Sequence, residues 1–165
     1  MEVRYSMENI DTDKKIVFLA GPTMRVSDDF DGLENQKSWR NEAIKMFEKL
    51  CNTIESDDLC LLIPEFRDNQ KPKGWSYGGQ IDWELMGLEK ADVILFWIPR
   101  NLETLPGFTT NIEFGEWMKS GKIVIGAPPE SPKNDYIKYR CELLGIPFEH
   151  HLTLTVFSAW NYITE

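Results

Sequence analysis

The chain has 165 residues and a formal net charge of −9. This length suits a single domain that buries its own core. The acidic balance argues against nucleic acid as the main partner, because a surface that binds a phosphate backbone needs clustered lysine and arginine. A small-molecule ligand is compatible with this composition.

The cysteines, histidines and apolar runs bear on metal binding and location. The three cysteines are widely spaced without a CxxC pair, and the two histidines, His150 and His151, are adjacent near the C-terminus. This spacing does not suit a metal site, and an odd number of cysteines suits a reducing compartment. No apolar run approaches the length of a membrane span, and residues 1–15 lack a signal-peptide core. We therefore expect a cytoplasmic protein that binds no metal and does not enter a membrane.

Strand signals recur along the chain after a polar segment, residues 1–15, which we interpret as a loose leader. Four short apolar runs bounded by turn residues predict buried strands, because parallel strands covered on both faces need no alternation. A further run, residues 153–157, alternates and is β-branched, which predicts a last strand or edge strand. The four buried runs cover residues 16–20, 59–63, 92–98 and 122–126.

Helical periodicity appears between the predicted strands. In residues 36–51 the apolar side chains recur at helical spacing, which predicts an amphipathic helix packed on the sheet. Residues 80–90 and 135–144 predict two more helices, and a shorter one is expected to begin near Asn111. The alternation predicts one α/β domain over residues 1–165, doubly wound, with a mostly parallel, flavodoxin-like sheet of about five strands.

Candidate ligand-binding residues follow the first predicted strand at its carboxyl end, the edge where open α/β sheets bind ligands. Gly21 and Pro22 end that strand, and a glycine there lets a ligand approach the main chain. Arg25 lies in a long loop, residues 24–35, and loops of this length are often functional. The sequence GPTMRV lacks the GxGxxG dinucleotide fingerprint, and no GxxxxGK[ST] motif occurs.

Two pairs of residues with aromatic or charged side chains are expected near the same edge. Trp39 and Arg40 stand at the start of the first predicted helix, where an arginine opposes the helix dipole. Its position favours the binding of a carboxylate or another anion, with an ordinary surface arginine as the alternative. Trp75 and Tyr77 lie on a second long loop, residues 68–79, where they can stack on a flat heterocycle or cap the core.

Three acids are candidates for chemistry. Glu113 is expected in the first turn of the helix that follows the strand at residues 92–98. A carboxylate there can act as a nucleophile or base, or simply complement the helix dipole. Asp82 and Glu84 lie two residues apart on the preceding helix, so they point in different directions and cannot both face one site squarely.

Taken together, these segments resemble the nucleoside 2-deoxyribosyltransferase superfamily, in particular its shorter, divergent branch. The matching segments are IVFLAGP, SWRNEAI, IDWELMGLEKADVILFWIP and TTNIEFGEWMKSGKIVIGAP. The most specific part is the spacing of Glu113, Gly115, Gly121, Lys122 and Val124 behind the ADVIL strand. The sheet expected for this family agrees with the sheet predicted from the strand signals.

The resemblance implies transfer of a 2-deoxyribosyl group between nucleobases. Glu113 matches the catalytic glutamate, which attacks C1′ of a nucleoside and forms a covalent glycosyl ester, with overall retention. Glu84 matches an acid on the preceding helix, where an aspartate is usual, and Asp82 is the nearby alternative. The family also uses an aspartate in the loop before the nucleophile to contact the base, whereas Glu103 is the only acid in that loop here.

The resemblance also implies the partners. These are a nucleoside or nucleotide and a free nucleobase, and no cofactor is expected. Thr109, Thr110 and Asn111 precede the glutamate and are expected to bind the 5′ end of the sugar, with help from the helix N-terminus. Family members form oligomers in which a neighbour's C-terminal residues close the site, so a homo-oligomer is expected, with Trp160 and Tyr162 as candidate closing residues.

Two other functions stay open on the sequence. Related enzymes hydrolyse nucleoside 5′-monophosphates, and the candidates for a phosphate pocket are Arg25, Arg40, Thr109 and Thr110. A non-catalytic module that binds a nucleoside or nucleotide is the third hypothesis, because the loop carboxylate of the family is missing.

Overall fold

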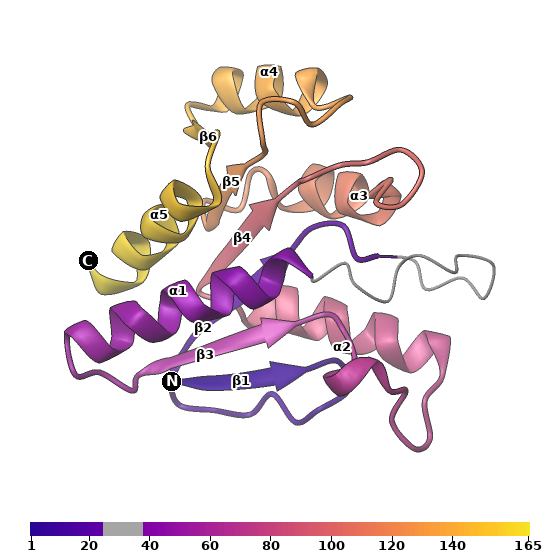
Figure 1. Ribbon diagram of the computed structural model, residues 1–165, viewed down its shortest axis with the longest axis vertical. Coiled ribbons are helices and arrows are strands. Elements are labelled where there is room, and N and C mark those ends of the chain that lie inside the picture. Colours follow the sequence, from indigo (N-terminus) through magenta and orange to yellow (C-terminus); the bar gives the residue numbers. More distant parts are fainter. Residues whose placement is uncertain (25–37) are drawn as a thin grey trace.

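A computed structural model describes residues 1–24 and 38–165. In this described part of the chain, six parallel strands form one sheet in the order β1-β3-β2-β4-β5-β6 (Figure 1). The strands are β1 (Glu2–Tyr5), β2 (Lys15–Ala20), β3 (Leu59–Ile63), β4 (Val93–Trp97), β5 (Ile123–Gly126) and β6 (Phe148–Glu149).

Helices cover both faces of the sheet, as expected for a doubly wound fold (Figure 1). One face carries α1 and α5, and the other carries α2, α3 and α4. A short 3₁₀ turn, Arg67–Asn69, follows β3. The helices are α1 (Trp39–Thr53), α2 (Tyr77–Lys90), α3 (Phe108–Trp117), α4 (Asp135–Leu144) and α5 (Leu152–Thr164).

The inner strands are apolar on both faces because helices cover both. In β4, Val93 and Leu95 pack with α1 and α5, whereas Ile94 and Phe96 pack with α2, α3 and α4. All five residues of β4 are buried. This explains why the strand signal in the sequence is a continuous apolar run and not an alternation.

Strands β2 to β6 have the flavodoxin-like order that was predicted, and β1 extends the sheet beyond β3. The chain crosses from β2 to β3 through α1 on one face, and from β3 to β4 through α2 on the other. The topological switch point therefore lies between the carboxyl ends of β2 and β4. This crevice is where doubly wound sheets bind their ligands.

The N-terminal segment is not a loose leader, so that prediction was wrong. Residues Glu2–Tyr5 form β1, which adds to the edge of the sheet beside β3. The following turn is held to the fold, because the Trp83 indole N–H donates to the carbonyl of Glu8 over 2.7 Å and Ile10 is buried. The polar composition misled the prediction because main-chain pairing places no demand on side-chain polarity at an edge.

The C-terminal segment was also predicted wrongly. Residues 153–157 belong to α5 and not to a strand. In α5 the buried side chains of Thr155, Val156 and Ala159 recur at helical spacing, which outweighs the β-branched composition. The last strand is the two-residue β6, in which Phe148 pairs with Ile125.

None of the helices in residues 1–24 and 38–165 has both the length and the apolar character needed to cross a membrane. The three cysteines, Cys51, Cys60 and Cys141, are buried and free. They are therefore ordinary core residues.

Candidate functional site at the sheet switch point

The turn after β2 lies against the end of β4, at the switch point. Gly21 has φ of 147°, and a Cβ at this position would collide with the main-chain oxygen of Trp97 and the ring of Trp39. Pro22 is buried, and a Cβ on Gly107 would lie 3.0 Å from its ring. Gly21 and Pro22 thus lie where the sequence placed them, in a turn that brings the main chain close to the neighbouring strand.

Trp39 and Arg40 hold this turn from the start of α1. The Trp39 indole N–H donates to the carbonyl of Pro22 over 3.2 Å. Arg40 is fully buried and donates to the carbonyls of Leu19 and Gly21 over 2.9 and 2.7 Å. The alternative of an ordinary surface arginine is wrong, because the side chain is buried. The expected binding of a carboxylate is met within the protein itself, by Glu65.

A carboxylate completes the surroundings of Arg40. Glu65, just after β3, accepts from Arg40 over 2.6 Å and from the Ser38 hydroxyl over 2.6 Å. Ser38 is also the N-cap of α1. This ion pair balances the buried guanidinium, so α1, β2 and β3 are tied together at the edge where a ligand would enter.

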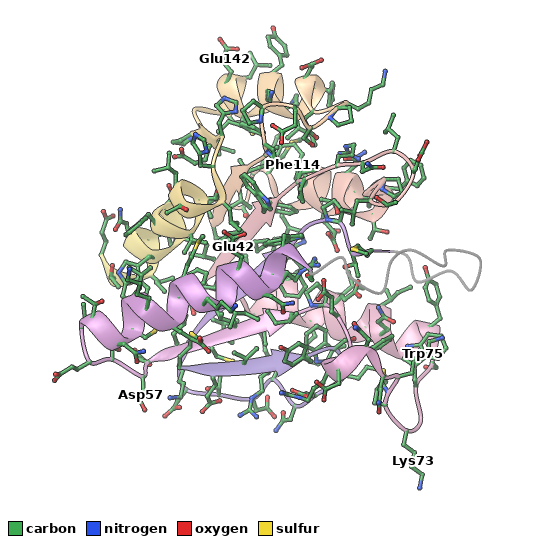
Figure 2. The ribbon with its side chains drawn as sticks, in the orientation of Figure 1. Glu42, Asp57, Lys73, Trp75, Phe114 and Glu142 are labelled. Atoms are coloured by element: carbon green, nitrogen blue, oxygen red, sulfur yellow. The ribbon has the colours of Figure 1, made fainter. Side chains whose placement is uncertain are left out.

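The helix that carries Glu113 begins earlier than predicted. It starts at Phe108, after Gly107 in a left-handed conformation, so Glu113 lies in the second turn and not the first. Phe114 lies between α3 and the sheet (Figure 2), where its ring meets Phe96 edge to face at 6.1 Å. With Phe114 facing the sheet, the half-buried Glu113 is turned toward α2.

Glu84 on α2 acts electrostatically on Glu113 on α3. Burial first, and then the negative charge of Glu84, raise the pKa of Glu113 to about 8, while Arg40 lowers it. Burial also raises the pKa of Glu84, against a hydrogen bond from Gln80 and the charge of Arg40. Glu113 therefore keeps its proton near neutral pH, with the charge of Glu84 as the second cause.

Asp82 and Glu84 point in different directions, as their spacing predicted. Asp82 is exposed on α2, whereas Glu84 is half-buried and bonded to Gln80 at 3.0 Å. The inward face of α2 is formed by Trp83, Gly87 and Leu88. Two apolar residues of α2 lie outside this face and are exposed. These are Ile81 and Leu85, with 38% and 47% of their surface accessible.

The three polar residues before Glu113 have different surroundings. Thr109 is exposed and Thr110 is buried in the first turns of α3. The side-chain oxygen of Asn111 accepts a hydrogen bond of 2.6 Å from Arg100. Thr109 and Asn111 are both exposed near the N-terminus of α3, but the oxygen of Asn111 is already bonded to Arg100.

Arg100 was not singled out from the sequence, although it organises the loop before α3. It is 5% exposed and donates to the carbonyls of Pro106 and Gly107 and to the side-chain oxygens of Asn111 and Asn134. In the described part of the chain its acceptors are all neutral oxygens, and burial lowers its pKa. The available signal was a charged residue shortly after an apolar strand, in a loop that contains Pro99 and Pro106. Prolines have no N–H to donate, so carbonyls in such a loop need donors from side chains.

Other predicted site residues lie elsewhere. Arg25 falls in residues 25–37, outside the described part of the structure. Glu103 is exposed in the turn that precedes α3. Trp160 packs on the core of its own chain, and the Tyr162 hydroxyl donates to the carbonyl of Gly121 over 2.9 Å. Both C-terminal aromatic residues therefore have contacts within the chain.

The fold defines a class of protein: a doubly wound α/β protein with the switch point of its sheet between β2 and β4, the crevice where this class binds small molecules. Comparison with protein families agrees with this class. The family model described as nucleoside 2-deoxyribosyltransferase like matches residues 14–131. The chain belongs to this family. No curated protein matched the chain in a separate comparison.

Proposed function

We propose that the protein transfers a 2-deoxyribosyl group between nucleobases through a covalent intermediate on Glu113. The observation that carries the proposal is the carboxyl pair of Glu113 and Glu84 between α3 and α2, in a chain that belongs to the nucleoside 2-deoxyribosyltransferase-like family. Asp82 is the less supported alternative to Glu84, because its side chain is exposed.

The singly protonated pair holds what the first half of this reaction requires. The bond between C1′ and the base nitrogen breaks, a bond between C1′ and a Glu113 oxygen forms, and the leaving base gains one proton. One ionised carboxylate is the nucleophile, and the protonated partner supplies the proton. In the second half an acceptor base attacks C1′ from the side that the first base left, and its proton returns to the pair, which gives overall retention.

Glu113 is mostly protonated in the free protein at pH 7, because its pKa is about 8. It becomes the nucleophile when the shared proton passes to Glu84 or toward the bound base. The positive charge of Arg40 favours the ionised form of both acids. Arg40 thereby contributes to the proposed chemistry through its charge alone, because its hydrogen bonds are made to protein atoms and not to the substrate.

The remaining candidates divide into supporting and contacting residues. We propose that Trp39 and Arg40 support the turn of Gly21 and Pro22, which contacts the sugar. Thr109 and the N-terminus of α3, whose N-cap residue Gly107 has no side chain, are proposed to bind its 5′ hydroxyl. The same helix N-terminus favours one second candidate, hydrolysis of nucleoside 5′-monophosphates, with phosphate in place of the hydroxyl.

A chromatographic assay with nucleosides and their 5′-monophosphates, each with and without a second free base, tests these assignments. The variant Glu113→Gln keeps the side-chain volume and removes the nucleophile. Glu142→Gln is the matched control, because Glu142 points outward from α4, at the far end of the molecule (Figure 2).

A new nucleoside that forms only with an acceptor base, and is lost in Glu113→Gln but kept in Glu142→Gln, supports the transferase. Release of free base without exchange assigns the protein to the hydrolases. Ligand binding that is equal in the wild type and Glu113→Gln, without turnover, contradicts both and leaves a binding module.

A further inference from the structure

A chain of two hydrogen bonds leads from the loop before α2 to Glu84. The Trp75 indole N–H donates to the side-chain oxygen of Gln80 over 3.0 Å. The side-chain nitrogen of Gln80 in turn donates to Glu84 over 3.0 Å. Gln80 and Glu84 are four residues apart on α2, so they are neighbours on one face of the helix.

The first bond decides how the Gln80 amide is turned. An indole N–H can only donate, so it requires the oxygen end of the amide, and the NH₂ end is left for Glu84. If the Trp75 bond were absent, the amide could turn over and present its oxygen to a protonated Glu84. Trp75 therefore selects the amide orientation that favours an ionised carboxylate at Glu84.

Trp75 lies near the N-terminal end of α2 (Figure 2), where several contacts hold it in place. Its ring meets Phe66 edge to face at 6.3 Å, and the Lys71 ammonium lies 3.9 Å from the ring centre. Its main-chain N–H donates to the carbonyl of Pro72 over 3.1 Å. With these contacts made, the indole N–H has a fixed direction.

We propose that Gln80, oriented by Trp75, is a positioning residue that keeps Glu84 ionised through its hydrogen bond and so leaves the proton needed for the proposed reaction on Glu113. The proposal rests on the proposed function for its catalytic consequence. Its physical basis is the hydrogen-bond geometry, since a donor fixed against one of two carboxyls stabilises the negative charge on that one.

The charges around Glu84 come from the neighbouring helices. Arg40 on α1 lowers the pKa of Glu84 and of Glu113, and Glu116, one turn beyond Glu113 on α3, raises the pKa of Glu113 slightly. Arg40 acts on both acids, so it does not distinguish them. Gln80 contacts Glu84, so it biases the proton toward Glu113 before a substrate arrives.

The pH dependence of turnover in Gln80→Met tests the proposal. Methionine has a similar length and no amide, so the doubly ionised pair loses a donor and holds its last proton to higher pH. We expect the alkaline limb of the profile to move upward by about 0.5 to 1 pH unit. Trp75→Phe keeps an aromatic ring against Phe66, and in this variant the alkaline limb should move in the same direction by less. The control Gln70→Met, at an exposed glutamine, should leave the alkaline limb unchanged.

A direct titration separates this proposal from the proposed function. Carboxyl ¹³C signals of glutamate, assigned with Glu84→Gln and Glu113→Gln, report both acids whether or not the protein turns over. If the Glu84 titration moves up in Gln80→Met while no reaction is found, the proton placement stands and the transferase fails.

If turnover is found but neither the profile nor the titration moves, the positioning role is overturned. A uniform fall in rate without a shift has the same meaning, because a purely structural glutamine would cause it. Should Gln80→Met not fold, Trp75→Phe provides both measurements, and an unchanged Glu84 titration in that variant overturns the proposal.

Discussion

The ammonium group of Lys122 lies 4.6 Å from the centre of the Trp117 ring on α3 and also caps the end of α2. Glu113 is one helical turn before Trp117, and Glu84 is one turn before Leu88. Lys122 therefore joins the two helices one turn away from the carboxyl pair. Its three acceptors are the main-chain carbonyls of Leu88, Glu89 and Ala91, at 2.9, 2.8 and 3.0 Å.

We expect Lys122→Met to lower the free energy of unfolding by about 2 kcal/mol, because the carbonyls at the end of α2 lose a charged donor. Turnover in the proposed reaction should fall about tenfold, since α2 and α3 lose the link that sets their spacing. Urea denaturation and the nucleoside assay measure the two effects. Lys119→Met, at an exposed lysine, is the control, and equal behaviour of the two variants would contradict this role.

Stability should depend on the proton of Glu113. Its pKa is about 8 in the folded protein against an ordinary 4.5, so the unfolded chain loses the proton first. The stabilisation by the neutral carboxyl is complete below about pH 4.5 and is lost as the pH rises toward 8 and beyond, by on the order of 2 to 3 kcal/mol after allowance for solvent screening.

Glu113→Gln should therefore flatten this dependence and be the more stable protein in alkaline solution. Urea denaturation from about pH 5 to about pH 9 checks the expectation. The control Glu142→Gln should keep the slope of the wild type. A slope that persists unchanged in Glu113→Gln would show that another group is responsible.

Two helical glycines should respond to alanine with opposite signs. At Gly87 on α2 a Cβ would lie 2.9 Å from the Phe18 ring and 3.2 Å from Leu62. Gly87→Ala should therefore cost about 1 to 3 kcal/mol through overpacking. At Gly115 on α3 the space is open, so Gly115→Ala should stabilise by about 0.5 to 1 kcal/mol through helix propensity. Thermal denaturation of both variants distinguishes packing from propensity, and shifts of the same sign would refute the assignment.

Arg100→Lys should destabilise the protein by about 2 to 3 kcal/mol although lysine keeps the positive charge. A lysine cannot reproduce the planar set of donors that joins Pro106, Gly107, Asn111 and Asn134. Arg140→Lys, at a partly exposed arginine bonded to the Tyr136 hydroxyl, is the comparison and should cost much less. Denaturant titration gives both values, and equal losses would be inconsistent with a special role for Arg100.

The inner sheet was predictable from the sequence because its strands are apolar on both faces. The runs at residues 16–20, 59–63, 92–98 and 122–126 correspond to β2, β3, β4 and β5 within one or two residues at their ends. The start of α3 was not predictable to the same precision. Gly107 in a left-handed conformation begins the helix, and its conformation follows from the fold of the preceding loop.

Segments with little hydrophobic signal were misread because their structure depends on distant partners. Residues 2–5 form a strand through main-chain pairing with β3, and residues 153–157 are helical because one face of α5 packs on the sheet. In both cases a tertiary contact outweighed local composition.

The sequence by itself determined the doubly wound sheet and pointed to Gly21, Glu84 and Glu113, because strand burial and residue spacing are local properties. Only the tertiary structure decided that Arg40 faces the protein and that Gln80 joins Trp75 to Glu84. These relationships depend on which donor meets which acceptor when α1, α2 and α3 pack together. Hydrogen-bond partners across helices leave no periodic trace in a single sequence.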